Sequence, residues 1–359
     1  MNTYKLTDIM RLSKVLCDAA KSSKPVFPQR TFSGIQPTGK LHLGNYFGAV
    51  QQWVDEVRNS QSPPSSKIFS IVNLHAITLP QTDLAKNTLS MAATLIACGL
   101  DLEKSILFEQ AQVHQHAELC WILGTLFTVN NLQRLPQFRE KSKSLKEVPW
   151  GLFSYPVLQA ADILLYKATH VPVGEDNEEN IGVARQIARQ FNHRHKALFP
   201  IPEIVLVKEE SGRRIKSLRN PEKKMSKSDT YKNSCIFLMD DPDTMLLKVK
   251  RAVTDMTSEV TFDPASRPGV SNLVCIHSGI TGKNPIEICD EVKGKDTGQY
   301  KMIVAESLIE HFKPINQEIT YLMKNQDYLE SLLHKGSMQA MEIAHKTLFE
   351  VKQAMELIR

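Results

Sequence analysis

The chain has 359 residues, of which 42% are hydrophobic, and this is enough apolar material for a buried core and for two or three domains. The formal net charge of +5 permits an anionic partner without requiring one. Six cysteines without a C-x-x-C pair argue against a zinc ribbon or a dense disulfide framework, and no apolar run approaches the roughly 20 residues that cross a bilayer.

The first 30 residues are basic and carry an apolar helical stripe. Six Lys or Arg side chains stand against only Asp8 and Asp18, and Ile9, Leu12 and Leu16 share one helical face. This pattern is typical of a mitochondrial transit segment, and a nonspecific amphipathic extension is the alternative. We therefore expect residues 1–30 to form an N-terminal extension and the protein to reach the mitochondrial matrix, with the cytoplasm as the other possibility.

From residue 30 onward, strand and helix patterns alternate. The first predicted helix carries Phe47, Val50, Val54 and Val57 at spacings of three and four, and a second helix covers 83–97. A third begins after Gly174 and runs to about Phe191. The predicted strands cover 30–36, 67–74, 105–108 and 169–173. This order predicts an α/β fold with a parallel sheet, helices on both faces, and ligands beyond the carboxyl ends of the strands.

Two further regions are predominantly helical. An insertion between the third and fourth strands is predicted to hold helices near 115–127 and 156–166, separated by a polar stretch at 137–148. Beyond Ser234 the strand alternation disappears, and the last helix repeats apolar residues every three or four positions from Met341 to Ile358. We therefore expect a catalytic domain over 31–233 and a helical C-terminal domain over 234–359.

The segment from Gly34 to Asn45 follows the first predicted strand and ends in the letters HLGN. Its three glycines allow the backbone to approach phosphates, and the following helix offers free N–H groups. His42 and Asn45 are neutral donors suited to phosphate oxygens. The structural alternatives are helix capping for Asn45 and solvation for His42.

A basic loop carries the letters KMSKS at 224–228. Lys224 and Lys227 supply point charges for the β- and γ-phosphates of a nucleotide, and Ser226 and Ser228 add hydroxyl donors. With HLGN, this loop indicates ATP-dependent activation of a carboxylate. Because the substrate carboxylate is the nucleophile, the protein needs to supply only alignment and charge stabilisation. Mg²⁺ is expected to arrive with ATP, so no dedicated metal site is predicted.

One predicted helix places polar groups among apolar ones. Tyr155, Gln159 and Asp162 share a face, and Ile163, Leu164 and Leu165 follow directly. A carboxylate in such surroundings is costly unless it is paired. An arginine or a helix N-terminus is the structural alternative to a binding role for Asp162.

Five segments taken together resemble the tryptophanyl-tRNA synthetases of bacterial and organellar type. They are FSGIQPTGKLHLGNYFGA (32–49), LHAIT (74–78), YPVLQAADILLY (155–166), VPVGED (171–176) and KKMSKSD (223–229). The resemblance runs from about residue 31 to the C-terminus and keeps the order of the family. It implies a class I Rossmann-type catalytic domain, a helical anticodon-binding domain and a homodimer that uses ATP, L-tryptophan and tRNA(Trp).

The resemblance also implies residue roles. Asp162 would accept the indole N–H, and Lys141 would approach the pyrophosphate together with His42, Asn45, Lys224 and Lys227. The implied tryptophan site contains Phe32, His75, Tyr155, Gln159 and Asp162. The implied ATP site contains Gln36, Pro37, Thr38, Gly44, Asn45, Gly174, Glu175, Asp176, Ile215, Lys224, Met225, Ser226, Lys227 and Ser228.

The sequence departs from the family pattern at Asn73, Gln159 and Asn177. Two other functions remain open. A tyrosyl-tRNA synthetase shares the fold, although Asp162 in its AADILLY setting favours tryptophan. A noncatalytic RNA-binding paralogue would retain the fold, but the intact HLGN and KMSKS segments argue against it.

Overall fold

A computed structural model describes residues 26–143, 145–174, 178–206, 215–227, 229, 231 and 233–359. Residues 1–25 of the predicted extension therefore lie outside the described residues. The same holds for Glu175, Asp176, Asn177 and Ser228. A five-stranded parallel sheet forms the centre of the molecule, in the order β3-β2-β1-β4-β5. The strands are β1 (Thr31–Ile35), β2 (Lys67–Ile71), β3 (Ile106–Glu109), β4 (His170–Val173) and β5 (Glu203–Leu206).

The order of the strands reverses direction at β1. The chain moves from β1 through β2 to β3 on one side, and then returns to place β4 on the other side of β1. Thr31 is accordingly opposite Lys67 in β2 and His170 in β4. Connections on both sides of β1 leave a crevice beyond the carboxyl ends of β1 and β4, where open α/β sheets bind ligands. The predicted α/β class and parallel sheet are confirmed.

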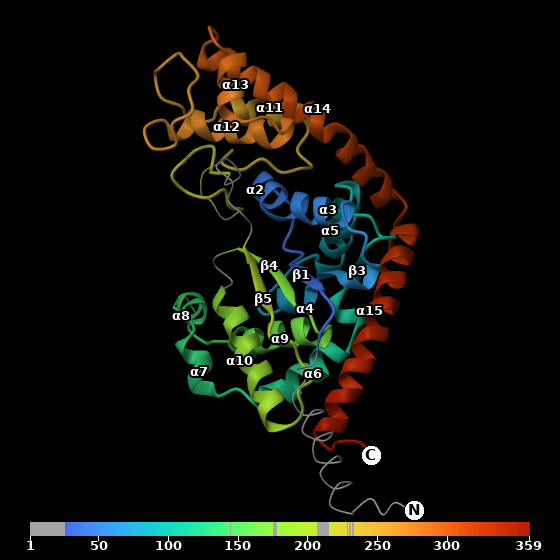
Figure 1. Cartoon of the computed structure of the whole chain (residues 1–359). Coiled ribbons are helices and arrows are strands. Elements are labelled where there is room, and N and C mark those ends of the chain that lie inside the picture. Colours follow the sequence, from blue (N-terminus) through green and yellow to red (C-terminus); the bar gives the residue numbers. More distant parts are fainter. Residues whose placement is uncertain are drawn as a thin grey trace, which may run out of the picture.

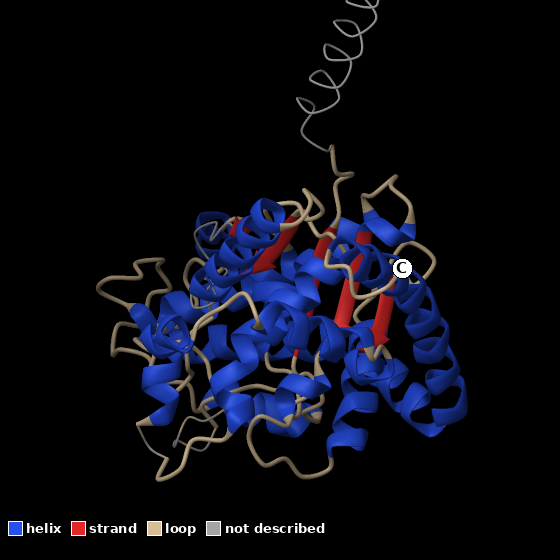
Figure 2. Cartoon of the chain, turned by 90° about the horizontal axis from the view of Figure 1, so that it is seen from below, coloured by secondary structure: helices blue, strands red, loops and turns tan. Residues whose placement is uncertain are grey.

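Helices cover both faces of the sheet, as Figure 2 shows with the strands side by side between them. Residues of β2 are buried throughout, including Lys67 and Ser70, as is typical of a central strand of a parallel sheet. The helices up to β5 are α2 (Leu43–Asn45), the π-helical turn η1 (Tyr46–Val50), α3 (Gln51–Arg58), η2 (Pro64–Ser66), α4 (Asn73–Ala76), α5 (Leu84–Ala97), η3 (Gln110–Gln112), α6 (Gln115–Gly124), α7 (Val129–Arg134), α8 (Pro136–Ser142), α9 (Trp150–Leu165) and α10 (Glu178–Arg194).

Every described element after residue 240 is helical, as the sequence predicts. These are α11 (Pro242–Lys250), α12 (Pro268–Thr281), α13 (Pro285–Glu291), α14 (Thr297–Lys324) and α15 (Gln326–Ala354). Their starts follow from capping: Asp241 accepts from the backbone N–H of Thr244 at 2.9 Å, and Asp296 forms a capping box with Gln299. Figure 1 shows α14 and α15 running along one side of the molecule, from the helical region back to the sheet.

The last helix packs against the outer strand of the sheet. An added Cβ at Gly336 in α15 would lie 1.9 Å from the carbonyl oxygen of Leu107 in β3, so only glycine allows this approach. Further along α15, Ala340, Ala344, Leu348 and Val351 are buried in a hydrophobic cluster with β3, α6, α9 and α10.

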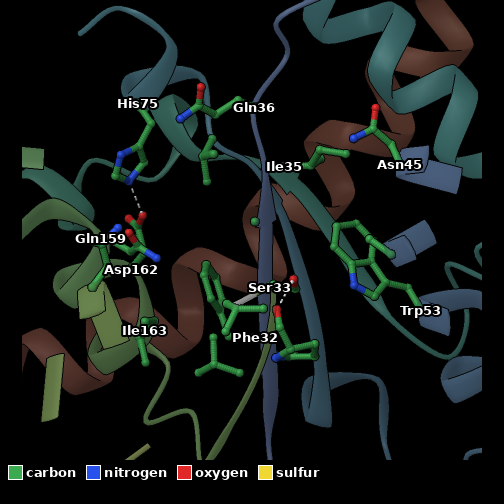
Figure 3. Close-up of a pocket in the computed structure, with 18 of the residues that line it drawn as sticks. Phe32, Ser33, Ile35, Gln36, Asn45, Trp53, His75, Gln159, Asp162 and Ile163 are labelled. Atoms are coloured by element: carbon green, nitrogen blue, oxygen red, sulfur yellow. Dashed lines mark hydrogen bonds and ion pairs between the residues drawn. The ribbon is translucent and has the colours of Figure 1, made fainter. Parts of the chain in front are cut away.

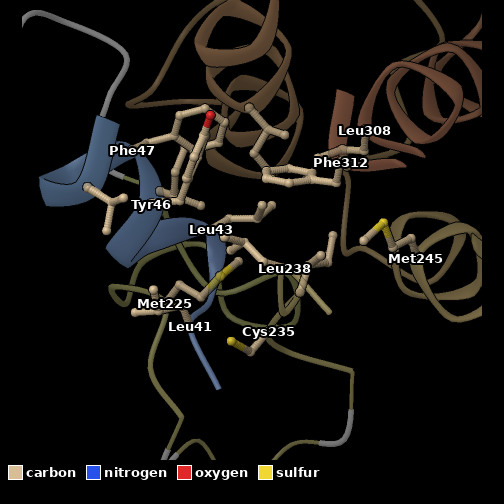
Figure 4. Close-up of a cluster of buried hydrophobic side chains, with 14 of the residues drawn as sticks. Leu41, Leu43, Tyr46, Phe47, Met225, Cys235, Leu238, Met245, Leu308 and Phe312 are labelled. Atoms are coloured by element: carbon tan, nitrogen blue, oxygen red, sulfur yellow. The ribbon is translucent and has the colours of Figure 1, made fainter. Parts of the chain in front are cut away.

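A second hydrophobic cluster joins α3 and α5 to α11, α12 and α14. Figure 4 shows part of it, in which the rings of Tyr46 and Phe312 meet with their centroids 5.1 Å apart. Both clusters contain residues from each side of the boundary expected between 233 and 234. The division into domains therefore stays a prediction. No helix in the described ranges is both long and apolar enough to span a bilayer.

Candidate active site

A cavity of about 390 Å³ opens at the carboxyl ends of β1 and β4, where the strand order reverses. Its walls come mainly from β1, β4, the helices that follow β1 and β2, and α9. The predicted residues that line it are Phe32, Gln36, Asn45, His75, Tyr155, Gln159, Asp162 and Gly174. Figure 3 shows Asp162 and His75 on one side of β1, with Asn45 and Trp53 on the other. Both implied ligand sites therefore contribute to a single cavity.

The other predicted residues that the structure describes do not line this cavity. They are Pro37, Thr38, His42 and Gly44 in the 34–45 segment, Lys224, Met225, Ser226 and Lys227 in the KMSKS loop, and Ile215 before that loop. Lys141 lies in α8, and its side chain is outside the described part of the structure, as are Glu175, Asp176 and Ser228.

His42 and Asn45 form a reciprocal cap at the start of α2. His42 Nδ1 accepts from the backbone N–H of Asn45 at 3.3 Å, and Asn45 Oδ1 accepts from the backbone N–H of His42 at 3.4 Å. The capping role and the phosphate role of Asn45 are compatible, because the cap uses Oδ1 and leaves the Nδ2 amide to donate into the cavity.

The electrostatic surroundings keep His42 neutral. Burial, together with the positive charges of Lys227 and Lys224, lowers the pKa of His42 to about 4. Because Nδ1 accepts a hydrogen bond, the proton of the neutral ring is on Nε2. His42 is thus a neutral N–H donor, as the sequence predicts.

The KMSKS segment lies directly against the HLGN segment. Lys227 Nζ donates to the carbonyl oxygen of Thr38 at 3.3 Å. An added Cβ at Gly44 would be 3.6 Å from Met225 Cβ and 3.0 Å from ring atoms of His42, so the absence of a side chain at Gly44 keeps this junction open. Two segments far apart in sequence thus meet beside the cavity.

Backbone pairing continues this contact beyond the loop. The N–H of Leu43 donates to the carbonyl of Ile236 at 3.0 Å, and the N–H of Leu238 donates to the carbonyl of Leu41 at 2.9 Å. Asp240 fixes the second segment by accepting from the backbone N–H of Phe237 at 2.9 Å and from Lys248 Nζ at 2.5 Å. Hydrogen bonds therefore hold the segment that follows the KMSKS loop against the start of α2.

Two residues expected near ATP turn their side chains into the core. Ile215 and Met225 are each 2% exposed and belong to the same hydrophobic cluster as Leu43, as Figure 4 shows for Met225. The backbone of Met225 also donates to the carbonyl of Ile215 at 3.1 Å. Any contact that these two residues make with a nucleotide must therefore come from their backbone.

Asp162 is 1% exposed and is the only acid among the described residues that line the cavity. Its Oδ2 accepts from His75 Nε2 at 2.7 Å, and its Oδ1 accepts from Gln110 Nε2 at 2.7 Å and His116 Nδ1 at 2.6 Å. Burial raises the cost of ionising this group, but its charge interactions and hydrogen bonds with His75 and His116 outweigh burial and hold its pKa well below the usual range.

The partners of Asp162 differ from the arginine or helix N-terminus considered as its structural alternative. His75 was predicted through the family resemblance, whereas Gln110 and His116 were not predicted to join this site. Gln110 begins η3 at the end of β3, and His116 lies in α6. No spacing in the sequence signals this contact, because it depends on how α6 packs against α9.

Three aromatic side chains stand among the aliphatic and polar residues of the remaining wall. Phe32, Trp53 and Tyr155 line it, and the Tyr155 hydroxyl donates to Gln137 Oε1 at 2.7 Å. Phe32 also stacks on Tyr166, with ring centroids 5.5 Å apart. Within the described residues, no group of three or more His, Cys, Asp or Glu side chains is placed to hold a metal ion. The site thus combines a cavity of mixed apolar and polar lining, one buried carboxylate and an adjoining set of N–H donors and lysines.

These features define an α/β enzyme that binds a nucleotide and a second ligand at the switch point of a parallel sheet. The family model described as "tRNA synthetases class I (W and Y)" matches residues 27–313. The chain belongs to this family of class I aminoacyl-tRNA synthetases, and the resemblance found in its sequence is confirmed.

Similar proteins extend over almost the whole chain. The "Tryptophan--tRNA ligase" of Wolinella succinogenes is 45% identical over 333 residues, covering 92% of this chain and 99% of the relative. That of Caldanaerobacter subterraneus is 43% identical over 332 residues, with the same coverage. The crystal structure of tryptophanyl-tRNA synthetase from Campylobacter jejuni "complexed with ADP and Tryptophane" has a TM-score of 0.79 at 30% identity, and covers 91% of this chain and 100% of that one.

Proposed function

We propose that this synthetase is a tryptophan–tRNA ligase. It activates L-tryptophan with ATP, carried in with Mg²⁺, to tryptophanyl-adenylate, and then transfers the tryptophanyl group to tRNA(Trp). The observation that carries this proposal is the buried carboxylate of Asp162 in a cavity that Phe32, Tyr155 and Asn45 also line. The names of the similar proteins support the same assignment.

The first step needs no protein nucleophile. A carboxylate oxygen of tryptophan forms a bond to the α-phosphorus of ATP, and the bond from that phosphorus to the pyrophosphate oxygen breaks. Donation to phosphate oxygens is assigned to the Asn45 amide, which lines the cavity, and to His42 Nε2–H, which lies next to it at the start of α2 without lining the cavity. Lys224 and Lys227 supply positive charge for the departing pyrophosphate. Catalysis then consists of alignment and stabilisation of the charge that develops.

Selection of the amino acid depends on Asp162. The indole ring is placed beside Phe32 and Tyr155, which line the cavity with Asp162, and the indole N–H donates to the carboxylate. Phenylalanine has no such donor and would leave the buried carboxylate incompletely paired. Sites built around a buried polar partner discriminate by about 10^4-fold or more without editing.

Amino-acid-dependent ATP–pyrophosphate exchange tests this proposal. Exchange that requires tryptophan and is absent with tyrosine is the expected result. Exchange that requires tyrosine would overturn the tryptophan assignment in favour of the other specificity in the family. Absence of exchange with either amino acid would support a noncatalytic paralogue.

The assembly proposed for this enzyme is a homodimer. Large apolar side chains are exposed on α6, on α7 and at the start of α9: Trp121 is 77% exposed, Trp150 72% and Val129 54%. Such exposure is typical of a surface that another chain covers. Light scattering should give twice the monomer mass, and the double variant Trp121→Lys, Trp150→Lys should give the monomer mass. A monomeric parent protein would refute the proposal.

The cellular role proposed is mitochondrial translation, and the helical region over 234–359 is proposed to bind the anticodon. The basic N-terminal segment supports import into the matrix, and the similarity to bacterial enzymes is compatible with an organellar origin. A fluorescent fusion of residues 1–35 should enter mitochondria. A fusion that stays diffuse in the cytoplasm would contradict this localisation.

A further inference from the structure

The carboxylate of Asp162 has one acceptor position left after its observed hydrogen bonds. Two carboxylate oxygens offer about four lone-pair positions. Oδ1 uses both of its positions for Gln110 and His116, and Oδ2 uses one for His75. Within the part of the chain that the structure describes, the remaining position is therefore on Oδ2.

The partners of the two carboxylate oxygens differ in whether they line the cavity. His75, which bonds Oδ2, lines the cavity with Asp162, and Figure 3 shows the hydrogen bond between them. Gln110 and His116, which bond Oδ1, do not line the cavity. Gln110 and His116, the two donors that do not line the cavity, thus occupy Oδ1. Oδ2 keeps one acceptor position for a ligand in the cavity.

His116 is held by contacts on several sides. It is 0% exposed, its Nδ1 faces Asp162 Oδ1 at 2.6 Å, and its Nε2 faces the Tyr166 hydroxyl at 2.8 Å. Phe108 stacks on its ring, with centroids 5.7 Å apart and planes inclined by 28°. Because a carboxylate only accepts hydrogen bonds, the Nδ1 atom of His116 carries a proton.

We propose that His116 is a positioning residue for amino-acid selection, and that Tyr166 holds it in place. By occupying Oδ1, His116 fixes the carboxylate so that Oδ2 alone meets a ring N–H in the cavity. This inference rests on the proposed function, because it deepens the account of how tryptophan is chosen. His116 does not line the cavity, so it acts through Asp162.

Two amide substitutions separate this role from a merely structural one. His116→Asn places an amide nitrogen where the Nδ1 atom lies, and thus keeps a donor for Asp162. His116→Gln reaches toward the Nε2 position, and thus keeps a partner for Tyr166 but removes one of the two donors to Oδ1 and leaves only Gln110 there. Both side chains are polar amides, so their comparison isolates the bond to the carboxylate.

The measurement is ATP–pyrophosphate exchange with tryptophan and with β-(3-benzothienyl)-L-alanine, in which sulfur replaces the indole N–H. The parent protein should prefer tryptophan in kcat/KM. His116→Gln should lower that preference by about tenfold or more, mainly through KM for tryptophan, because a hydrogen bond to a charged group is lost. His116→Asn should stay within about threefold of the parent preference, since it retains this bond.

A matched control is His277→Asn. His277 is also buried and faces a tyrosine hydroxyl, with its Nδ1 atom 3.4 Å from the Tyr300 oxygen, but it lies in α12 outside the cavity. This variant should keep the parent preference even where its thermal stability falls. Equal preferences in the parent, His116→Asn and His116→Gln would overturn the role proposed for His116. A parent protein without tryptophan-dependent exchange would instead overturn the proposed function.

Discussion

His42 shows how the surroundings of one residue set its chemistry. Burial and two neighbouring lysines lower its pKa to about 4, so the ring stays neutral through the range in which an ordinary histidine titrates. We expect kcat/KM for ATP to show no inflection near pH 6.5 that arises from this group. An inflection there that disappears in His42→Asn would contradict the neutral-donor role.

The same lowered pKa also links His42 to stability. Its folded-state value lies below its unfolded-state value, so the unfolded chain binds the proton first as the pH falls. The stabilising contribution is complete above about pH 6.5 and is lost as the pH falls toward 4, on the order of 1 kcal/mol per pH unit. Urea unfolding at pH 7.5 and pH 5 should show a smaller loss for His42→Asn than for the parent protein.

Lys227 tests the assignment of the basic loop. Lys227 is an exposed residue, and its Nζ donates to the carbonyl oxygen of Thr38 at 3.3 Å, beside the HLGN segment. Lys227→Ala should lower kcat/KM for exchange by about 10²-fold or more, while tryptophan binding measured by calorimetry stays within about threefold. Lys250→Ala, on the last turn of α11, is the control and should leave exchange unchanged. Unchanged exchange in Lys227→Ala would remove the lysine from the reaction.

Local sequence identified some site residues and could not identify others. Asn45 and Asp162 belong to recognisable segments, and both line the cavity. The partners Gln110 and His116 carry no local signal, because their contact with Asp162 exists only after β3, α6 and α9 have packed together. The burial of Ile215 and Met225 was likewise a consequence of tertiary packing.

The contact between α15 and β3 permits a sharp test with a single glycine. Gly336→Ala would place its Cβ 1.9 Å from a backbone oxygen of β3, so one element must shift. We expect a loss of about 2 kcal/mol or more in the free energy of unfolding. Gly182→Ala in α10, with no atom within 4 Å of the added Cβ, should be stabilising by about 0.5 kcal/mol. Equal stabilities in urea unfolding would contradict the packing described.

The strands β1 to β4 could be predicted from the alternation of strand and helix patterns along the sequence. The short elements β5 and α8 could not. The sequence predicts β1 to β4 to within a few residues. β5 was missed because Pro200 and Pro202 precede a strand of only four residues at the sheet edge. α8 was missed because its polar composition resembles a loop, although Pro136 at its first turn is a helix-start signal.

The two hydrophobic clusters determine how the molecule unfolds as a whole. Each contains residues from both sides of the predicted boundary at 233/234, so the helical C-terminal region shares its core with the sheet. We therefore expect a single calorimetric unfolding transition, with a van't Hoff enthalpy equal to the calorimetric enthalpy. Two well-separated transitions would show that the predicted domains unfold independently.

A crystal structure of the protein with L-tryptophan and a non-hydrolysable ATP analogue tests the proposed function most directly. The predicted result places the indole nitrogen within hydrogen-bond distance of Asp162 Oδ2, and places the phosphates between Asn45 and the KMSKS segment. Tryptophan bound with its indole N–H away from Asp162, or a nucleotide bound outside the junction of the HLGN and KMSKS segments, would contradict it.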